Sequence, residues 1–308
     1  MTLLSSESPA VTVREIDLTG IVPAVTSTTG AIVGEFNWGP VNTPVLIGNE
    51  SELASTFGSP LSGDAYAGDF LSASYFLKYS SSAFVVRADR PDILDSDGAI
   101  AHEGYRKSSA GVFEAKYFGK LGDTIKIDTA DASAFSGWAY EGYFTAAPQA
   151  NEVHVIVIQN EVVVETYEFV STIAGSRNPN GTNNFVTDVI NAGSSWITVS
   201  GVPTAGSSTL SGGEDGVAAA VTEYASAFDV FLNKEAIQID FLISPAGGQD
   251  KAQQVHLKLV EIATSRKDCV AVISPTIGDV DAMISYVSTL NSPSSYLIVD
   301  GNWFKVYN

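Results

Sequence analysis

The chain has 308 residues, with 16 basic and 35 acidic side chains and a formal net charge of −19 at pH 7. This acidity argues against an electrostatic surface for nucleic acid or for an anionic membrane. It serves either solubility or the recognition of a basic partner. A single cysteine excludes an intrachain disulfide, and the chain has no apolar run of about 18 residues and no secretory leader, so we expect no membrane insertion.

Residues 1–20 predict an extended arm ahead of the core. Val11, Val13 and Glu15 alternate in this segment, and Ile16 continues it. Fully stretched, an arm of this length spans about 60 Å, enough to reach a neighbouring molecule. A frayed terminus is the alternative that these residues leave open.

Residues 31–38 mix apolar and small side chains as a half-buried strand does, and Pro40 ends the pattern. A second strand and a short helix follow. Asn49 or Ser51 offers a side-chain oxygen to cap that helix, and Gly58 is free to take a positive φ at its end.

Residues 64–79 carry aromatic and aliphatic side chains at intervals of about three to five, which predicts an amphipathic helix. Residues 83–88 are apolar on both faces apart from Arg87, which is typical of a strand covered on two sides. The order of these elements, with the Trp-Gly-Pro turn, resembles the N-terminal part of the tail sheath proteins of contractile-tailed bacteriophages.

Residues 94–211 have a different sequence pattern, in which charged residues and glycines separate short runs with the character of β-strands. The runs predict strands at 111–118, 123–129, 152–158, 161–170 and 195–200 and a helix at 185–192, with a tight hairpin at Gln159-Asn160. The segment around Ala115-Lys116-Tyr117 resembles a sheath family turn, although Phe118 stands where a proline is common. The glycines at 212–216 resemble the link that returns sheath chains to their main domain, and they lack the ending of a P-loop.

The remaining residues alternate between helix and strand. We expect helices at 217–228, 251–266 and 279–290, and strands at 236–244, 269–274 and 295–299. This order predicts right-handed crossovers and a largely parallel sheet. The family resemblance implies a subtilisin-like arrangement of that sheet.

The expected fold is therefore mixed α/β (α+β), with a largely parallel sheet, flanking helices, an inserted β-rich domain and an N-terminal arm. We expect the core to comprise residues 21–93 and 212–308, and residues 94–211 to form the insert and face outward. Sheath proteins normally continue into a C-terminal domain that faces the tube. The resemblance thus implies a truncated subunit or a minimal relative.

We also tested the sequence for catalytic and metal sites. His154 and His256 fall within a predicted strand and helix, and no triad can be assembled around them or His102. Ser244 and Ser274 precede prolines at strand ends, where a turn is the simpler interpretation than a catalytic site. We expect a buried structural thiol at Cys269, no metal site, no cofactor and no enzymatic activity.

The resemblance implies a structural subunit that polymerises around the tail tube and contracts to drive the tube through the host envelope. Its implied partners are further copies of itself, the tail tube, the baseplate and the tail terminator, with no direct nucleic acid. The implied locations are the virion and, during assembly, the host cytoplasm. The alternatives are a sheath of a bacteriocin or type VI secretion system and an α/β hydrolase-like enzyme.

Overall fold

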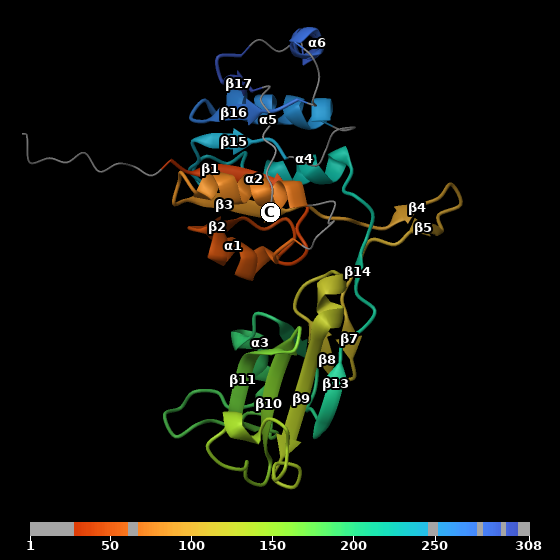
Figure 1. Ribbon diagram of the computed structural model, residues 1–308, viewed down its shortest axis with the longest axis vertical. Helices are drawn as coiled ribbons and strands as arrows, with labels where there is room; N and C mark the ends of the chain where they lie inside the picture. Colours follow the sequence, from red (N-terminus) through yellow and green to blue (C-terminus); the bar gives the residue numbers. More distant parts are fainter. Residues whose placement is uncertain (1–27, 61–66, 246–251, 276–279, 291–293, 301–308) are drawn as a thin grey trace, which may run out of the picture.

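The computed structural model describes residues 28–60, 67–245, 252–275, 280–290 and 294–300. The predicted arm at 1–20, with Val11, Val13, Glu15 and Ile16, lies outside these residues. The described chain forms two bodies that are joined by a narrow crossing, with a two-stranded ribbon projecting from the side (Figure 1).

The first body is built on a six-stranded sheet in the order β17-β16-β15-β1-β3-β2. Its strands are β1 (Gly30–Gly34), β2 (Val45–Ile47), β3 (Ala83–Arg87), β15 (Phe241–Ile243), β16 (Val270–Ile273) and β17 (Leu297–Val299). Every pairing is parallel except that of β2 with β3. The predicted mixed α/β class is confirmed.

Six helices accompany the sheets in the described residues. They are α1 (Glu50–Phe57), α2 (Ala67–Leu77), α3 (Val186–Gly193), α4 (Val221–Asp229), α5 (Ala252–Arg266) and α6 (Val280–Leu290). The longest of them has 15 residues. No helix in the described part of the chain combines the length and the apolar character needed to cross a bilayer.

Strand β1 is buried along its whole length because helices cover both faces of the sheet. Ala31 and Val33 join the core beneath α4 and α5, whereas Ile32 joins the core with α1 and α2. Gly34 lets α2 approach closely, since a Cβ there would lie 2.6 Å from Cβ of Asp69. The period-two alternation of a strand thus serves two cores at once.

The second body contains a four-stranded sheet in the order β11-β10-β9-β13 and a three-stranded sheet in the order β12-β8-β7. Its elements are β7 (Ser109–Ala110), β8 (Phe113–Ala115), η1 (Lys120–Thr124), β9 (Ile125–Asp131), η2 (Glu141–Tyr143), β10 (Glu152–Gln159), β11 (Val162–Ser171), β12 (Ile197–Val199) and β13 (Gly206–Thr209). Asn160 and Glu161 both have positive φ between β10 and β11. The hairpin predicted at Gln159-Asn160 is confirmed, with the backbone of a type I′ turn.

Two elements begin later than the sequence predicts. The strand expected at 236–244 pairs only from Phe241, and just before it the Asp240 carboxylate accepts a hydrogen bond from Thr29 N ahead of β1. The helix expected at 217–228 begins at Val221, because the backbone N–H of Ala219 donates to Glu35 instead of facing a helix. At both starts a side-chain carboxylate forms a hydrogen bond with the backbone N–H of a residue distant in sequence.

The sequence patterns missed four short strands at the crossing between the bodies. These are β4 (Ile93–Leu94), β5 (Ile100–His102), β6 (Tyr105–Arg106) and β14 (Glu214–Asp215). β4 pairs with β5 to form the projecting ribbon, and β6 pairs with β14 where the chain leaves and re-enters the first body. Strands of two or three residues are too short to show a period.

The structure decides between the two candidate caps of α1. Asn49 Oδ1 accepts a hydrogen bond from Glu52 N at 2.9 Å, whereas Ser51 lies inside the helix. Asn49→Ala should therefore lower the free energy of unfolding by about 1 kcal/mol. Ser51→Ala is the control, and its free energy of unfolding should change little. Urea unfolding of the two variants measures the difference, and an equal loss of stability in both would contradict the assignment of Asn49 as the cap.

Candidate functional site

The two bodies are joined by a buried polar network, which we call the junction and define by Glu35, Arg87, Arg90, Tyr105 and Asp215. Arg90 Nη2 lies 2.7 Å from Glu35 Oε2, and the two side chains are 1% and 5% exposed. Arg90 Nη1 also donates to the backbone oxygen of Asp215 at 2.8 Å. The ion pair therefore joins the end of β1, the exit from β3 and the returning chain at β14.

Glu35 has a second role beside this ion pair. Its Oε1 accepts from Ala219 N at 2.6 Å, and its own backbone N–H donates to the Asp69 carboxylate at 2.9 Å. Tyr224 of α4 donates from its hydroxyl to the same Asp69 oxygen at 3.4 Å, and burial raises the pKa of that phenol. Helices α2 and α4, on opposite faces of the sheet, are thus tied to one carboxylate network.

Arg87 extends the junction toward the second body. Its Nε donates to the Tyr105 hydroxyl at 3.1 Å, and its Nη1 donates to the carbonyls of Gly39 at 3.2 Å and Phe118 at 2.9 Å. Complete burial lowers the pKa of this guanidinium, while Tyr105 and Asp215 oppose that change. Arginine stays protonated in proteins, so the side chain acts as a fixed cation that binds carbonyls of both bodies.

An aromatic contact lies beside the junction. Trp38, just beyond β1, is 1% exposed and stacks on Trp196 with ring centroids 5.6 Å apart. Tyr117 meets the Trp38 ring edge-on at 5.3 Å. Trp38 is therefore part of the second body's hydrophobic core although it belongs to the first body by sequence.

Sequence reasoning did not assign a role to the junction residues. Its one signal was Arg87, the only charged side chain in the apolar run that forms β3. Glu35, which follows the buried residues of β1, carries the same signal of a charge next to a covered strand. The identity of its partners could not be deduced, because Ala219 is 184 positions away.

His154 is a structural residue of the second body. Its Nε2 donates to the Ala146 carbonyl at 2.8 Å, and its Nδ1 accepts from Phe169 N at 3.1 Å. The ring also stacks on Phe144, with centroids 4.3 Å apart. With both nitrogens engaged in this way, the ring holds Phe169 at a positive φ of 48° in a bulge of β11.

His256 is also buried, at 2% exposure, on α5. Its Nδ1 lies 2.5 Å from the Tyr286 hydroxyl of α6. Burial lowers the pKa of His256 to about 4 and raises that of Tyr286 to about 12, so the phenol donates and the neutral imidazole accepts. The pair links two helices.

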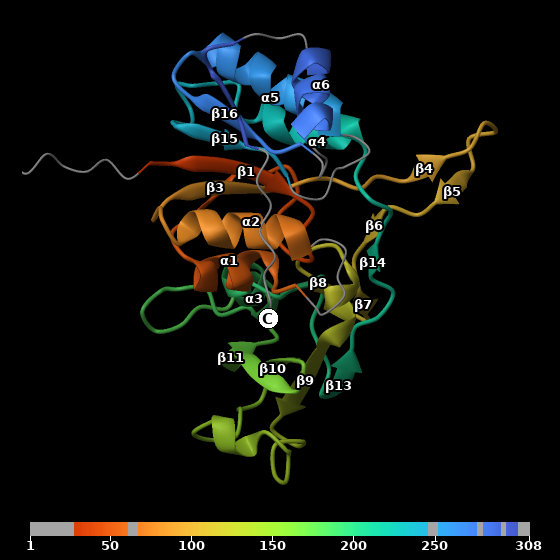
Figure 2. The same cartoon turned by 45° about the horizontal axis from the view of Figure 1, so that its top comes forward.

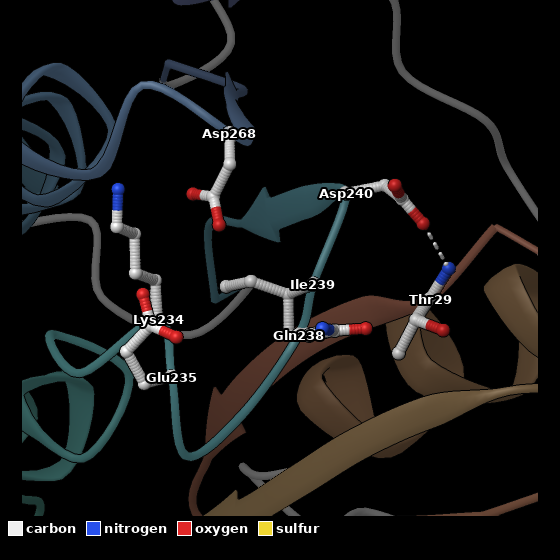
Figure 3. Close-up of a pocket in the computed structure, with 7 residues that line it drawn as sticks. All are labelled: Thr29, Lys234, Glu235, Gln238, Ile239, Asp240 and Asp268. Atoms are coloured by element: carbon white, nitrogen blue, oxygen red, sulfur yellow. Dashed lines mark hydrogen bonds between the residues drawn. The ribbon is translucent and has the colours of Figure 1, made fainter.

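A hollow in the described surface lies at the amino ends of β1, β15 and β16 (Figure 3). It measures about 500 Å³ and is lined by Thr29, Lys234, Glu235, Gln238, Ile239, Asp240 and Asp268. The Asp240 carboxylate accepts from Thr29 N at 2.7 Å, and Asp268 pairs with Arg266, which lowers the pKa of Asp268. The lining contains no histidine or cysteine, and the carboxylates of Asp240 and Asp268 are engaged in structural contacts.

The remaining chemically reactive candidates are also explained by packing. Ser244 Oγ accepts from Ser274 N at 3.1 Å, and Ser274 donates to the Asp300 carbonyl, so both serines support turns at strand ends. Cys269 is 3% exposed, and burial raises its pKa to about 11. Among the described residues no group of three or more His, Cys, Asp or Glu side chains could hold a metal ion.

In comparisons with known proteins, this chain matches a family model, curated relatives and solved structures of tail sheath proteins. The family model described as the N-terminal region of domain III of the tail sheath protein Gp18 matches residues 27–88. The tail sheath protein of Salmonella phage ViI is 25% identical across 98% of this chain and 67% of its own length. The tail sheath protein of Enterobacteria phage T4 is 34% identical over 128 residues, which are 41% of this chain and 18% of that protein.

The chain is similar to tail sheath proteins. A solved sheath tail protein from Listeria innocua has the same fold over 80% of this chain and 48% of its own, with a TM-score of 0.52 and 17% identity. A second, from Desulfitobacterium hafniense, covers 96% of this chain and 56% of its own, with a TM-score of 0.52 and 11% identity. The chain thus spans about two thirds of the ViI protein and about half of the solved structures.

The Glu35–Arg90 pair should contribute strongly to the stability of the fold. Arg90→Gln leaves the buried Glu35 carboxylate without its cation, so we expect the free energy of unfolding to fall by about 3–5 kcal/mol. Chemical denaturation measures the loss. The control Lys107→Gln breaks the exposed Lys107–Glu114 pair and should cost at most about 1 kcal/mol. Equal losses in the two variants would refute the role of burial.

His256 should make the fold sensitive to acid. Because its pKa falls from 6.5 to about 4 on folding, the unfolded chain binds the proton first, and stability is complete above pH 6.5 and lost between pH 6.5 and about 4. The loss is on the order of 3 kcal/mol. His256→Gln should flatten the dependence of Tm on pH in this range. The exposed His102→Gln is the control and should leave the profile unchanged.

Proposed function

We propose that this chain is a structural subunit of a contractile phage tail sheath. In this proposal copies polymerise around the tail tube, and contraction of the polymer drives the tube through the host envelope for genome ejection. The observation that carries the proposal is the match to the ViI tail sheath protein along 98% of the chain. The match extends through both bodies and the junction between them.

The proposed mechanism is rigid-body movement of subunits between two sets of contacts. The buried ion pair at the junction and the aromatic stack beside it support this mechanism, because they oppose bending within a subunit. Contacts between unlike surfaces do not close on themselves and so generate stacked rings or an open helix. Each additional 100 Å² of apolar surface buried on contraction contributes about 2.5 kcal/mol before ordering costs. Summed over a long polymer, such gains drive the movement without nucleotide hydrolysis.

The proposed partners are other copies of this chain, the tail tube protein, the baseplate and the tail terminator. The proposed locations are the virion and, during assembly, the host cytoplasm. We further propose that the subunit acts without enzymatic activity or cofactor and binds no nucleic acid directly. The acidic net charge supports the last point.

We propose that residues 21–93 and 212–308 form one discontinuous core domain of subtilisin-like architecture and that residues 94–211 form an insert that faces outward. Sheet membership supports the division, because the six-stranded sheet takes no strand from between Arg87 and Phe241. The exposed loop at 177–184 supports the outward placement of the insert.

A sheath of a related contractile injection system, such as a bacteriocin or a type VI secretion apparatus, is the second candidate. It is favoured by one observation, namely that the two solved sheath tail proteins with this fold come from bacteria. Imaging of the native particle separates the two candidates, since only a phage tail carries a capsid.

Deletion of residues 1–20 tests the proposed assembly. We expect the shortened chain to keep its circular dichroism spectrum and unfolding transition, because the two described cores lie beyond the deletion, and to form no tubes by negative-stain electron microscopy. Deletion of residues 1–6, which leaves Val11, Val13, Glu15 and Ile16 in place, is the control and should still assemble. Normal tubes from the longer deletion would exclude a linking role for the arm.

A further inference from the structure

The ribbon of β4 and β5 is an exposed apolar surface on an otherwise acidic chain. It projects away from both bodies in two views (Figures 1 and 2). Ile93, Leu94 and Ile100 are 44%, 58% and 50% exposed. Leu94 pairs with Ile100 and Ile93 with His102, with a register shift between the two pairs, and the consecutive side chains of Ile93 and Leu94 point to opposite faces of the ribbon.

The ribbon has a fixed shape although its strands pair only with each other. At its base, the Asp92 carboxylate accepts from Gly104 N and from Arg106 Nη2, each at 2.7 Å. At its tip, the Asp95 carboxylate accepts from the backbone N–H groups of Asp97 and Ala99, each at 2.9 Å. A two-stranded ribbon is marginally stable in water, so a pre-shaped one with aliphatic side chains on both faces indicates a docking element.

The opposite end of the first body carries a surface of complementary chemistry. Tyr75, Lys78 and Tyr79 lie at the carboxyl end of α2, and we call them the α2-end patch. Tyr79 is 93% exposed, and the Lys78 ammonium lies 4.3 Å from the centroid of the Tyr75 ring. Lys78 has no ion pair within the described part of the chain, whereas the ribbon bears the exposed acids Asp97 and Glu103.

Strand β3 separates the two surfaces. The α2-end patch comes just before β3 begins at Ala83, and the ribbon follows its end at Arg87. Because a strand is extended, the ribbon and the patch lie at opposite ends of the sheet (Figure 2). A contact between them cannot form within one molecule, and between molecules it is head-to-tail and leaves one free surface at each end.

We propose that the ribbon of one copy docks on the α2-end patch of the next copy. Ile and Leu side chains pack on the tyrosine rings, and the ribbon acids face Lys78. The charges favour this occupant over a second ribbon, because two ribbons would bring their acids together. The inference rests on the proposed function, since it names one of the contacts by which the subunits polymerise.

Cysteine cross-linking tests the contact. Cys269 is buried, so a short bismaleimide cross-linker should react only with the introduced thiols. The double variant Ile100→Cys with Tyr79→Cys should give a ladder of covalent oligomers under assembly conditions. A mixture of the two single variants should stop at dimers, and each single variant alone should give none. Val162→Cys, at a site 63% exposed on the second body, replaces Tyr79→Cys in the control pair and should give no ladder.

The outcomes separate this inference from the proposed function. Tubes seen by electron microscopy without a ladder in the double variant overturn the contact and leave the sheath function standing. Cross-linked dimers of Ile100→Cys alone also overturn it, because they show ribbon against ribbon. Absence of both tubes and ladder overturns the contact together with the function.

Charge reversal gives an independent measurement. Asp97→Lys and Lys78→Glu should each raise the protein concentration needed for assembly about tenfold, because each places like charges across the contact. The double variant should restore assembly to within about threefold of the unaltered chain. Circular dichroism confirms folding of each variant. Additive losses in the double variant would overturn the proposed pairing of the two surfaces.

Discussion

The arrangement of the whole chain depends on the buried ion pair between Glu35 and Arg90. A carboxylate and a guanidinium removed from water need close pairing and further hydrogen bonds to offset their lost hydration. Here that requirement fixes the ends of β1 and β3, the backbone at Ala219 and the returning chain at Asp215. Segments from both halves of the sequence must be in place together, so the point at which the second body joins the first is determined by charge.

A junction of this kind makes the subunit stiff where it is narrowest. The second body is connected by two passages of the chain, which alone would allow it to swing. Arg87 and Trp38 add a cation bound to carbonyls on both sides and an aromatic stack across the crossing. Bending would expose a buried charge and separate the rings. In the proposed sheath, strain is therefore relieved at contacts between subunits rather than inside them.

Local signals in the sequence predicted much of this fold. A side-chain cap of α1 from Asn49 or Ser51, the turn after Gln159 and the alternation of helices and strands after residue 217 each depend on near neighbours, and the structure has all three, with Asn49 as the cap. The late starts of β15 and α4 could not be predicted, because Asp240 and Glu35 act on distant backbone groups. The ribbon was missed because strands of two or three residues carry no periodicity, and the arm stays a prediction.

In the proposed head-to-tail contact, force between neighbouring copies acts along the strands of the first sheet. Force applied at the α2-end patch enters the chain just before β3, and the ribbon leaves it just after. Between them, β3 is hydrogen-bonded to β1 on one side and to β2 on the other, with its axis along the load. Ladder hydrogen bonds loaded in this direction are sheared together rather than opened one by one. Arg87, at the far end of β3, passes the load to the junction, so the two bodies move as one when either surface is pulled.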